Sequence, residues 1–139
     1  MERFEPLIII PALNEEHSIG TILSQIPENY NVLVVDDGST DNTAEIVTFC
    51  GAKLVKHISN KGYAAAIHSG FEYAQAHDYT HVITFDADGE HNPESLQFVI
   101  DHLRQAPASL VIGIRANRRR ISEHVTAFIC KIKQRVFQS

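Results

Sequence analysis

Long apolar runs are missing from this sequence of 139 residues, and cysteine is scarce. No run approaches the roughly 18 apolar residues that a membrane-spanning helix needs. The segment Met1–Glu5 also lacks the basic-then-apolar order of a secretory signal, so we expect the protein to be cytoplasmic. Cys50 and Cys130 are too few and too far apart for a zinc knuckle or a disulfide framework, which indicates reduced thiols.

Glycine is absent from the segment Pro11–Glu16, which follows the first apolar stretch. This absence excludes a dinucleotide-binding fingerprint, and the sequence contains no P-loop either. Hydrophobic residues nevertheless make up 44% of the chain, and they recur from Leu7 to Phe137. A chain of this length can bury roughly two thirds of its unfolded surface. The composition therefore predicts one globular domain.

Charge is distributed unevenly along the chain. Residues 1–112 carry 16 acidic and 5 basic side chains, a net charge of −11, whereas residues 113–139 carry 7 basic side chains and one acidic side chain, a net charge of +6. An acidic body with a basic end indicates cation chemistry in the body and an anionic surface near the end. We expect no nucleic acid partner, because the acidic body repels phosphates.

Short apolar runs of strand length alternate with segments of helix length. Strands are expected at Leu7–Ile10, Val32–Val35, Leu54–Val55, Val82–Phe85 and Leu110–Ile114, and helices at Ser18–Ile26, Thr43–Cys50, Ala64–Ala76 and Glu94–Gln105. Ser39 or Thr40 can cap the second helix, and Gly51 can end it. The alternating order predicts an α/β fold of three layers, in which helices cover both faces of a mostly parallel sheet.

A polar cluster follows each expected strand. The five clusters are Pro11–Glu16, Asp36–Ser39, Asn60–Gly62, Asp86–His91 and Arg115. In open α/β sheets ligands bind beyond the carboxyl ends of the strands, which meet at one edge when the strands are parallel. Each loop alone is consistent with an ordinary turn. Five loops at equivalent positions favour one shared site.

Three carboxylates, Asp86, Asp88 and Glu90, stand two residues apart after an apolar strand. Like charges this close repel one another unless a cation lies between them. Oxygen ligands without cysteine favour Mg²⁺ or Mn²⁺, with coordination positions left for substrate phosphates. The alternative is a solvated acidic turn. His91 adjoins this cluster, whereas the other histidines are expected at the surface.

Two more clusters offer groups that suit a nucleotide. Asp36 and Asp37 end the second strand, where a carboxylate can accept hydrogen bonds from a ribose hydroxyl or a base N–H. The alternative is that one aspartate caps the next helix and the other pairs with a neighbour. Lys61 can balance the charge of a diphosphate, with Gly62 allowing close backbone approach. The alternative there is an exposed lysine at the start of a helix.

The segment Ile121–Phe137 places six apolar residues on one helical stripe with lysine and arginine around it. This pattern predicts a basic amphipathic helix. Such a helix suits a membrane surface, and the alternative is an ordinary helix packed on the sheet. The preceding run Arg118–Arg120 fits an anionic neighbour or plain solvation.

These clusters together resemble the family 2 glycosyltransferases of the GT-A fold. The motifs that carry the resemblance are Pro-Ala-Leu-Asn-Glu-Glu at 11–16, Asp-Asp-Gly-Ser-Thr-Asp at 36–41, Asn-Lys-Gly at 60–62, Asp-Ala-Asp-Gly-Glu-His-Asn-Pro-Glu at 86–94 and Val-Ile-Gly-Ile-Arg at 111–115. The likeness is strongest to the branch that transfers sugars to dolichyl or polyprenyl phosphate. It implies a metal-dependent enzyme that moves a sugar from a UDP- or GDP-linked donor with inversion at the anomeric carbon.

The resemblance also implies roles for single residues. Asp86 and Asp88 would form the DxD motif, which holds the donor diphosphate through Mg²⁺ or Mn²⁺, and Glu90 would also reach the metal. Arg115 would face the phosphates. Together with the residues discussed above, this gives the expected nucleotide-binding set. Its members are Pro11, Ala12, Asn14, Glu15, Asp36, Asp37, Lys61, Gly62, Asp86 and Ala87.

The implied acceptor is a polyprenyl phosphate, which places the protein peripherally at the inner membrane face. A lipid phosphate is already ionised and can attack without a general base, and none is identifiable in this sequence. Family members continue beyond the point where this sequence stops. We therefore expect residues 1–115 to form a nucleotide-sugar-binding core, incomplete at its C-terminal end, and residues 116–139 to begin the acceptor side. The last strand would leave a sheet edge open to another copy of the chain.

Two other functions are consistent with the sequence. One is a nucleotide-sugar-binding piece without catalysis. The other is a haloacid-dehalogenase-like phosphotransferase, because Val82–Gly89 also fits an apolar strand that ends in a nucleophilic aspartate. In that family the motif lies near the start of the fold. Here three strand–helix units precede it, and Glu90 stands where a hydroxyl residue is expected.

Overall fold

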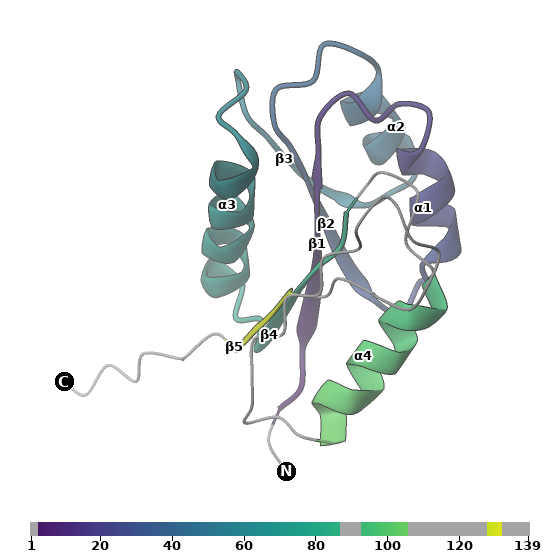
Figure 1. Cartoon of the computed structure of the whole chain (residues 1–139), viewed down its shortest axis with the longest axis vertical. Coiled ribbons are helices and arrows are strands. Elements are labelled where there is room, and N and C mark those ends of the chain that lie inside the picture. Colours follow the sequence, from purple (N-terminus) through teal and green to yellow (C-terminus); the bar gives the residue numbers. More distant parts are fainter. Residues whose placement is uncertain (1–2, 87–92, 106–127, 132–139) are drawn as a thin grey trace, which may run out of the picture.

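The structure is a computed structural model that describes residues 3–86, 93–105 and 128–131. Five strands and four helices occur in these ranges (Figure 1). They are β1 (Pro6–Ala12), α1 (Ile19–Gln25), β2 (Asn31–Asp36), α2 (Thr43–Phe49), β3 (Lys53–Lys56), α3 (Tyr63–Ala76), β4 (His81–Thr84), α4 (Pro93–Gln105) and β5 (Phe128–Lys131).

The strands form one sheet in the order β3-β2-β1-β4-β5. β1 pairs in parallel with both β2 and β4, and β2 pairs in parallel with β3. β5 is antiparallel to β4, with His81 opposite Lys131 in the register. Because β1 to β4 are parallel, their carboxyl ends share one edge, toward the top of Figure 1. Chemistry carried by the loops after these strands is therefore collected at that edge.

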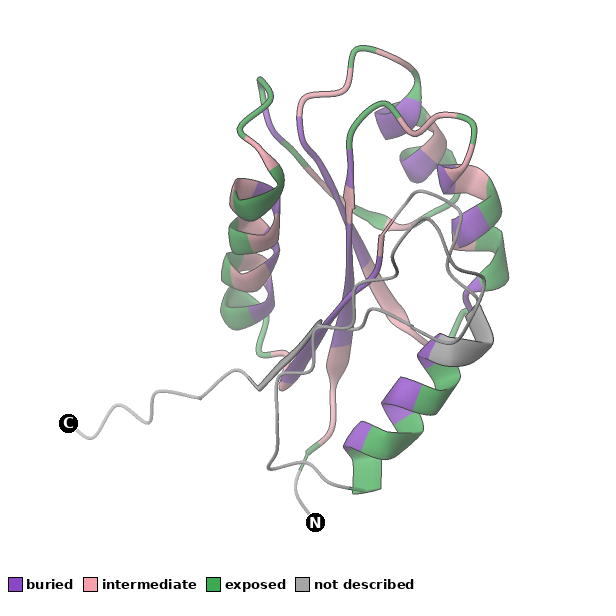
Figure 2. Cartoon of the chain, viewed as in Figure 1, coloured by how far each residue is buried: buried purple, intermediate pink, exposed green. Residues whose placement is uncertain are grey.

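Helices cover both faces of the sheet, which confirms the three-layer prediction. On one face, alternate strand residues such as Ile8, Ile10 and Val34 pack with apolar residues of α1, α2 and α4. On the other face, Leu7, Ile9, Leu33, Val35 and Val82 pack against α3. β1, β2 and β4 are buried along most of their length, whereas no residue of β3 is fully buried (Figure 2). Burial on both faces explains why the strand sequences are continuously apolar instead of alternating.

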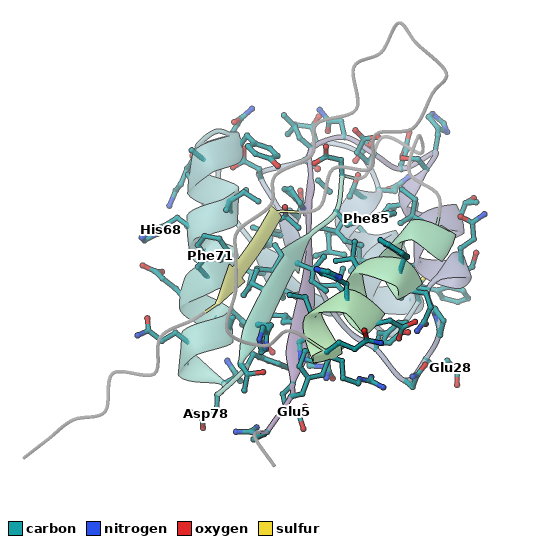
Figure 3. The ribbon with its side chains drawn as sticks, turned by 60° about the horizontal axis from the view of Figure 1, so that its bottom comes forward. Glu5, Glu28, His68, Phe71, Asp78 and Phe85 are labelled. Atoms are coloured by element: carbon teal, nitrogen blue, oxygen red, sulfur yellow. The ribbon has the colours of Figure 1, made fainter. Side chains whose placement is uncertain are left out.

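Two helices meet the sheet in different ways. α4 buries Leu96, Val99, Ile100 and Leu103, a spacing that places them on one helical stripe. α3 instead presents Ala66, Gly70 and Ala74 to the sheet. These small residues let α3 approach β1 closely, because a Cβ at Gly70 would lie 2.7 Å from Ile9. In Figure 3, His68 points away from the sheet and Phe71 points toward it.

The structure corrects two sequence predictions. The expected helix over 121–137 is wrong at Phe128–Lys131, which forms strand β5. This short run begins with an aromatic and a β-branched residue and is compatible with either a helix or a strand. Pairing with the edge of β4 favours the extended form. The expected cap of α2 is also wrong: the helix begins at Thr43, as expected, but its N-cap is Asn42 instead of Ser39 or Thr40, and Asp41 accepts the Thr43 N–H at 3.0 Å. The strand expected at Leu110–Ile114 lies outside the described residues.

Candidate functional site

The loops that follow β1, β2 and β3 lie at the same edge of the sheet as the residues after β4 (Figure 1). Main-chain bonds continue the sheet beyond the strand ends: the Asp37 N–H donates to the Ala12 carbonyl at 2.9 Å, and the His57 N–H donates to the Asp36 carbonyl at 2.8 Å. Glu5 and Asp78, labelled in Figure 3, mark the opposite end of the molecule.

Most of the expected site residues meet at this edge. Those that the structure describes are Pro11, Ala12, Asn14, Glu15, Asp36, Asp37, Lys61, Gly62 and Asp86. The remaining four, Ala87, Asp88, Glu90 and Arg115, lie outside the described residues, as does His91.

The β1–α1 loop is joined to the β2–α2 loop by reciprocal hydrogen bonds around Asn14. The Asn14 N–H donates to the Ser39 hydroxyl, and the Asn14 side-chain oxygen accepts the Thr40 N–H, both at 2.9 Å. Asn14 has a φ of 53°, a left-handed conformation that asparagine tolerates better than most residues. Ser39 and Thr40 therefore hold the neighbouring loop instead of capping a helix.

A second set of bonds joins the same two loops through Thr43, which is fully buried. Its hydroxyl accepts the Glu15 N–H at 2.9 Å and donates to Asp41 at 2.5 Å. Asp41 also accepts the Glu16 N–H at 3.2 Å. Desolvation raises the pKa of Asp41, but the bonds from Thr43 and Glu16 outweigh it and hold that pKa below 3.8, the ordinary value.

Asp36 is the last residue of β2, and its side chain is completely buried. One carboxylate oxygen, Oδ1, accepts the Ser39 N–H at 2.9 Å. The other, Oδ2, has no hydrogen-bond partner in the part of the chain that the structure describes. A buried carboxylate oxygen without a partner is costly, and such atoms occur where a ligand or another polar group completes the bonding.

Asp37 binds the β3–α3 loop with both carboxylate oxygens. Oδ1 accepts the Lys61 N–H at 2.8 Å and contacts the His57 Nδ1 at 2.8 Å, while Oδ2 accepts the Gly62 N–H at 2.9 Å. Burial raises the pKa of Asp37, but the hydrogen bonds from His57 and from the two backbone N–H groups lower it by more than burial raises it. The pKa of this carboxyl therefore lies below its ordinary value of 3.8.

His57 is a site residue that the sequence analysis missed. It is buried, although the histidines other than His91 were expected at the surface. Its Nδ1 faces Asp37, and its Nε2 lies 2.8 Å from the hydroxyl of Ser69 on α3. A single histidine after a short strand carries no local signal, since its two partners stand 20 and 12 residues away in the sequence.

The loop that carries Lys61 packs tightly on the β2–α2 loop. A Cβ built at Gly38, whose φ is 79°, would lie 2.5 Å from the Ser59 carbonyl carbon and 2.6 Å from the Asn60 nitrogen. Only glycine permits this approach of two backbones. The Lys61 side chain is exposed at the rim of the edge. The Lys61 ammonium is thus free to meet an anionic group that enters from solvent.

Asp86 stands two residues beyond β4 and is half-buried. The Tyr63 hydroxyl, at the start of α3, lies 3.4 Å from its Oδ1. A half-buried carboxylate at this edge has the chemistry of one ligand of Mg²⁺ or Mn²⁺. The described residues contain no group of three or more His, Cys, Asp or Glu side chains arranged to hold a metal. Two of the three expected metal ligands, Asp88 and Glu90, fall outside them.

None of the described helices has the length and apolar character that crossing a membrane requires.

Comparison with known proteins gives the same fold and identifies the family. A crystal structure of glucosyl-3-phosphoglycerate synthase from Mycobacterium tuberculosis, in complex with Mn²⁺, UDP and glucosyl-3-phosphoglycerate, superposes with a TM-score of 0.67 at 22% identity. The superposition covers 79% of this chain and 43% of the synthase chain. This likeness confirms the GT-A fold.

Two curated relatives are similar in sequence. Undecaprenyl-phosphate 4-deoxy-4-formamido-L-arabinose transferase of Aeromonas hydrophila is 35% identical, over 81% of this chain and 37% of the relative. UDP-N-acetylglucosamine–dolichyl-phosphate N-acetylglucosaminyltransferase of Methanococcus voltae is 32% identical, over 78% of this chain and 51% of the relative. The chain thus spans about half the length of these relatives, or less.

The model of glycosyl transferase family 2 matches residues 7–129, from the second residue of β1 to beyond α4. The resemblance noted from the motifs is therefore confirmed, and the chain belongs to glycosyl transferase family 2.

Proposed function

We propose that this chain binds a nucleoside diphosphate sugar together with Mg²⁺ or Mn²⁺ at the carboxyl edge of its sheet, and that it serves the transfer of the sugar to an acceptor. The observation that carries the proposal is Asp36, whose buried Oδ2 lacks a partner among the described residues. It lies where the loops after three parallel strands converge. A ribose hydroxyl or a base N–H would complete its bonding.

The other site residues take complementary parts in this proposal. Pro11, Ala12, Asn14 and Glu15 border the nucleotide on the β1–α1 loop, and Asp37 holds the loop whose Lys61 faces the diphosphate. Asp86 is the one proposed ligand of the cation that lies among the described residues. Beyond the described residues, we assign Ala87 to the nucleotide, Asp88 and Glu90 to the same cation and Arg115 to the phosphates.

The chemistry requires charge stabilisation at this edge. When the bond between sugar and diphosphate breaks, negative charge develops on the departing nucleotide and the sugar acquires oxocarbenium character. Bound to the diphosphate, Mg²⁺ or Mn²⁺ supplies electrostatic stabilisation of that charge. Lys61 adds positive charge from the protein.

The names of the relatives support the choice of donor and acceptor. The Methanococcus voltae relative is named for UDP-N-acetylglucosamine and dolichyl phosphate, and the Aeromonas hydrophila relative for undecaprenyl phosphate. We propose a polyprenyl phosphate as acceptor, reached from the membrane surface. Its ionised phosphate would attack the anomeric carbon from the face opposite the nucleotide, with inversion and without a general base.

The direct test is calorimetric titration of UDP and of GDP into the 139-residue chain, with and without Mn²⁺. We expect one of the two nucleotides to bind at least about tenfold more tightly with Mn²⁺. Asp86→Asn should remove this metal dependence. Asp78→Asn makes the same charge change at the opposite end of the molecule, where Asp78 is exposed, and should leave it intact. Equal affinity with and without Mn²⁺ for both nucleotides would refute the proposal.

A further inference from the structure

A chain of three side chains crosses from the carboxyl edge of β2 to the middle of α3. The Asp37 Oδ1 lies 2.8 Å from the His57 Nδ1, and the His57 Nε2 lies 2.8 Å from the Ser69 Oγ. Asp37 and His57 are both buried. Because the Asp37 carboxylate can only accept, the His57 Nδ1 carries a hydrogen and donates it to Asp37.

The order Asp–His–Ser is that of a hydrolase triad, but the surroundings of Ser69 do not fit nucleophilic catalysis. Ser69 lies in the interior of α3, seven residues or fewer from either end of the helix. Backbone N–H groups in a helix interior are already bonded to carbonyls one turn back. They cannot form the pair of donors that an acyl-transfer site needs for its oxyanion. The three side chains therefore have another task.

The hydrogen bonds of Asp37 to the β3–α3 loop indicate what that task is. Besides His57, its two oxygens accept the backbone N–H groups of Lys61 and Gly62 at 2.8 and 2.9 Å. The same loop packs against Gly38, where no side chain fits. The orientation of the Asp37 carboxylate thus determines where the Lys61 loop sits. His57 fixes that orientation, and Ser69 anchors the imidazole to α3.

We propose that His57 is a positioning residue for nucleotide binding. By donating from Nδ1 to Asp37, it holds that carboxylate in the orientation that presents the Lys61 loop to the diphosphate. The inference rests on the proposed function for its ligand, a nucleoside diphosphate. Its structural half, the ordering of the loop by His57, stands on the hydrogen bonds alone.

Two substitutions of His57 test the contacts of its two ring nitrogens one at a time. Asparagine places its amide nitrogen near the position of Nδ1, so His57→Asn keeps a donor toward Asp37 and loses the contact with Ser69. Glutamine places its amide nitrogen near Nε2, so His57→Gln keeps the reach to Ser69 and loses the donor toward Asp37. His81→Gln is the matched control. His81 is also buried and bonded to a hydroxyl, that of Thr80, but it is the first residue of β4 and lies away from the carboxyl edge of the sheet.

The first measurement is amide hydrogen exchange of Lys61 and Gly62 by NMR, without nucleotide. We expect exchange at both amides to be at least about tenfold faster in His57→Gln than in the wild-type chain, and close to wild type in His57→Asn and His81→Gln. The second measurement is the Kd for UDP with Mn²⁺. It should rise about tenfold or more in His57→Gln and less than about threefold in the other two variants.

The outcomes distinguish this inference from the proposed function. If the wild-type chain does not bind UDP or GDP, the proposed function fails, and amide exchange still decides whether His57 orders the loop. If the wild-type chain binds and His57→Gln and His57→Asn weaken binding equally, His57 has only a general structural role and the inference is overturned. Unchanged exchange at Lys61 and Gly62 in His57→Gln also overturns it.

Discussion

Asp37 makes the stability of the folded chain depend on pH in a defined direction. Its carboxylate accepts three hydrogen bonds in the folded chain, and its pKa lies below 3.8 there, whereas in the unfolded chain the pKa returns to its ordinary value. The folded state therefore binds this proton less readily. The stabilisation is fully present above the unfolded pKa, and it is lost as the pH falls through the lower, folded pKa.

We predict that Asp37→Asn lowers the free energy of unfolding by about 1–3 kcal/mol near pH 7, because the amide nitrogen cannot accept the Gly62 N–H. The loss should shrink as the pH falls below 3.8, because the Asp37 carboxyl of the unfolded wild-type chain takes up a proton there, and it should be smallest below the lower pKa of the folded chain. Urea unfolding of both chains across this range measures the difference. A gap between the two chains that is constant from neutral to acid pH would contradict the account.

Gly38 provides a second prediction for a single residue. Its φ of 79° and the 2.5 Å approach to the Ser59 carbonyl carbon both oppose a side chain. Gly51 has nearly the same φ, 78°, but nothing lies within 4 Å of a Cβ built there. Gly51→Ala therefore reports the backbone strain alone, and Gly38→Ala reports the strain plus the clash between loops.

Gly38→Ala should cost about 1–3 kcal/mol more in the free energy of unfolding than Gly51→Ala. It should also weaken nucleotide binding, since it displaces the loop that carries Lys61, whereas Gly51→Ala leaves binding unchanged. Chemical unfolding and UDP titration of the two variants check both statements. Equal losses of stability would show that the packing of the two loops contributes nothing.

At the scale of elements, the β1–α1 and β2–α2 loops are held as one unit by side chains that bond across them. Thr43 is the centre of this unit, with its hydroxyl bonded to the Glu15 N–H and to Asp41. Thr43→Val keeps the shape and removes both bonds, leaving a donor and an acceptor unsatisfied. We predict a loss of about 1–3 kcal/mol in the free energy of unfolding.

Thr48 offers the control for this prediction within the same helix. Its hydroxyl donates to the Ala44 carbonyl, which belongs to α2 itself. Thr48→Val should change the stability by less than about 0.5 kcal/mol. Thermal unfolding of both variants gives the comparison. If Thr43→Val proved as mild as Thr48→Val, the two loops would not depend on each other through this hydroxyl.

At the scale of the whole molecule, the sheet was predictable because its strands are short, apolar and separated by helix-length segments. Runs such as Leu7–Ile10 and Val32–Val35 need burial on both faces, and that need predicts parallel strands under helices. Parallel strands place their carboxyl ends together, so the meeting of Asp36, Lys61 and Asp86 at one edge followed from topology alone.

What the sequence did not predict depends on contacts between distant segments. His57 acquires its role only when β2 and α3 bring Asp37 and Ser69 to its two nitrogens. Strand β5 forms from residues that suit a helix equally well, and the edge of β4 decides between the two. The different partners of Asp36 and Asp37 were likewise open, because both stand at the same strand end. Asp36 accepts the Ser39 N–H, whereas Asp37 accepts the N–H groups of Lys61 and Gly62.

The central claim is that these loops form one site for a nucleoside diphosphate and a divalent cation. Its most direct measurement is NMR of the isotope-labelled chain with UDP, in which paramagnetic Mn²⁺ replaces Mg²⁺ and broadens nearby amide signals. We expect the strongest broadening at Asp37, Gly62, Tyr63 and Asp86, and the weakest at Glu5 and Asp78 at the opposite end. Broadening that is uniform, or strongest away from the carboxyl edge of the sheet, would contradict it.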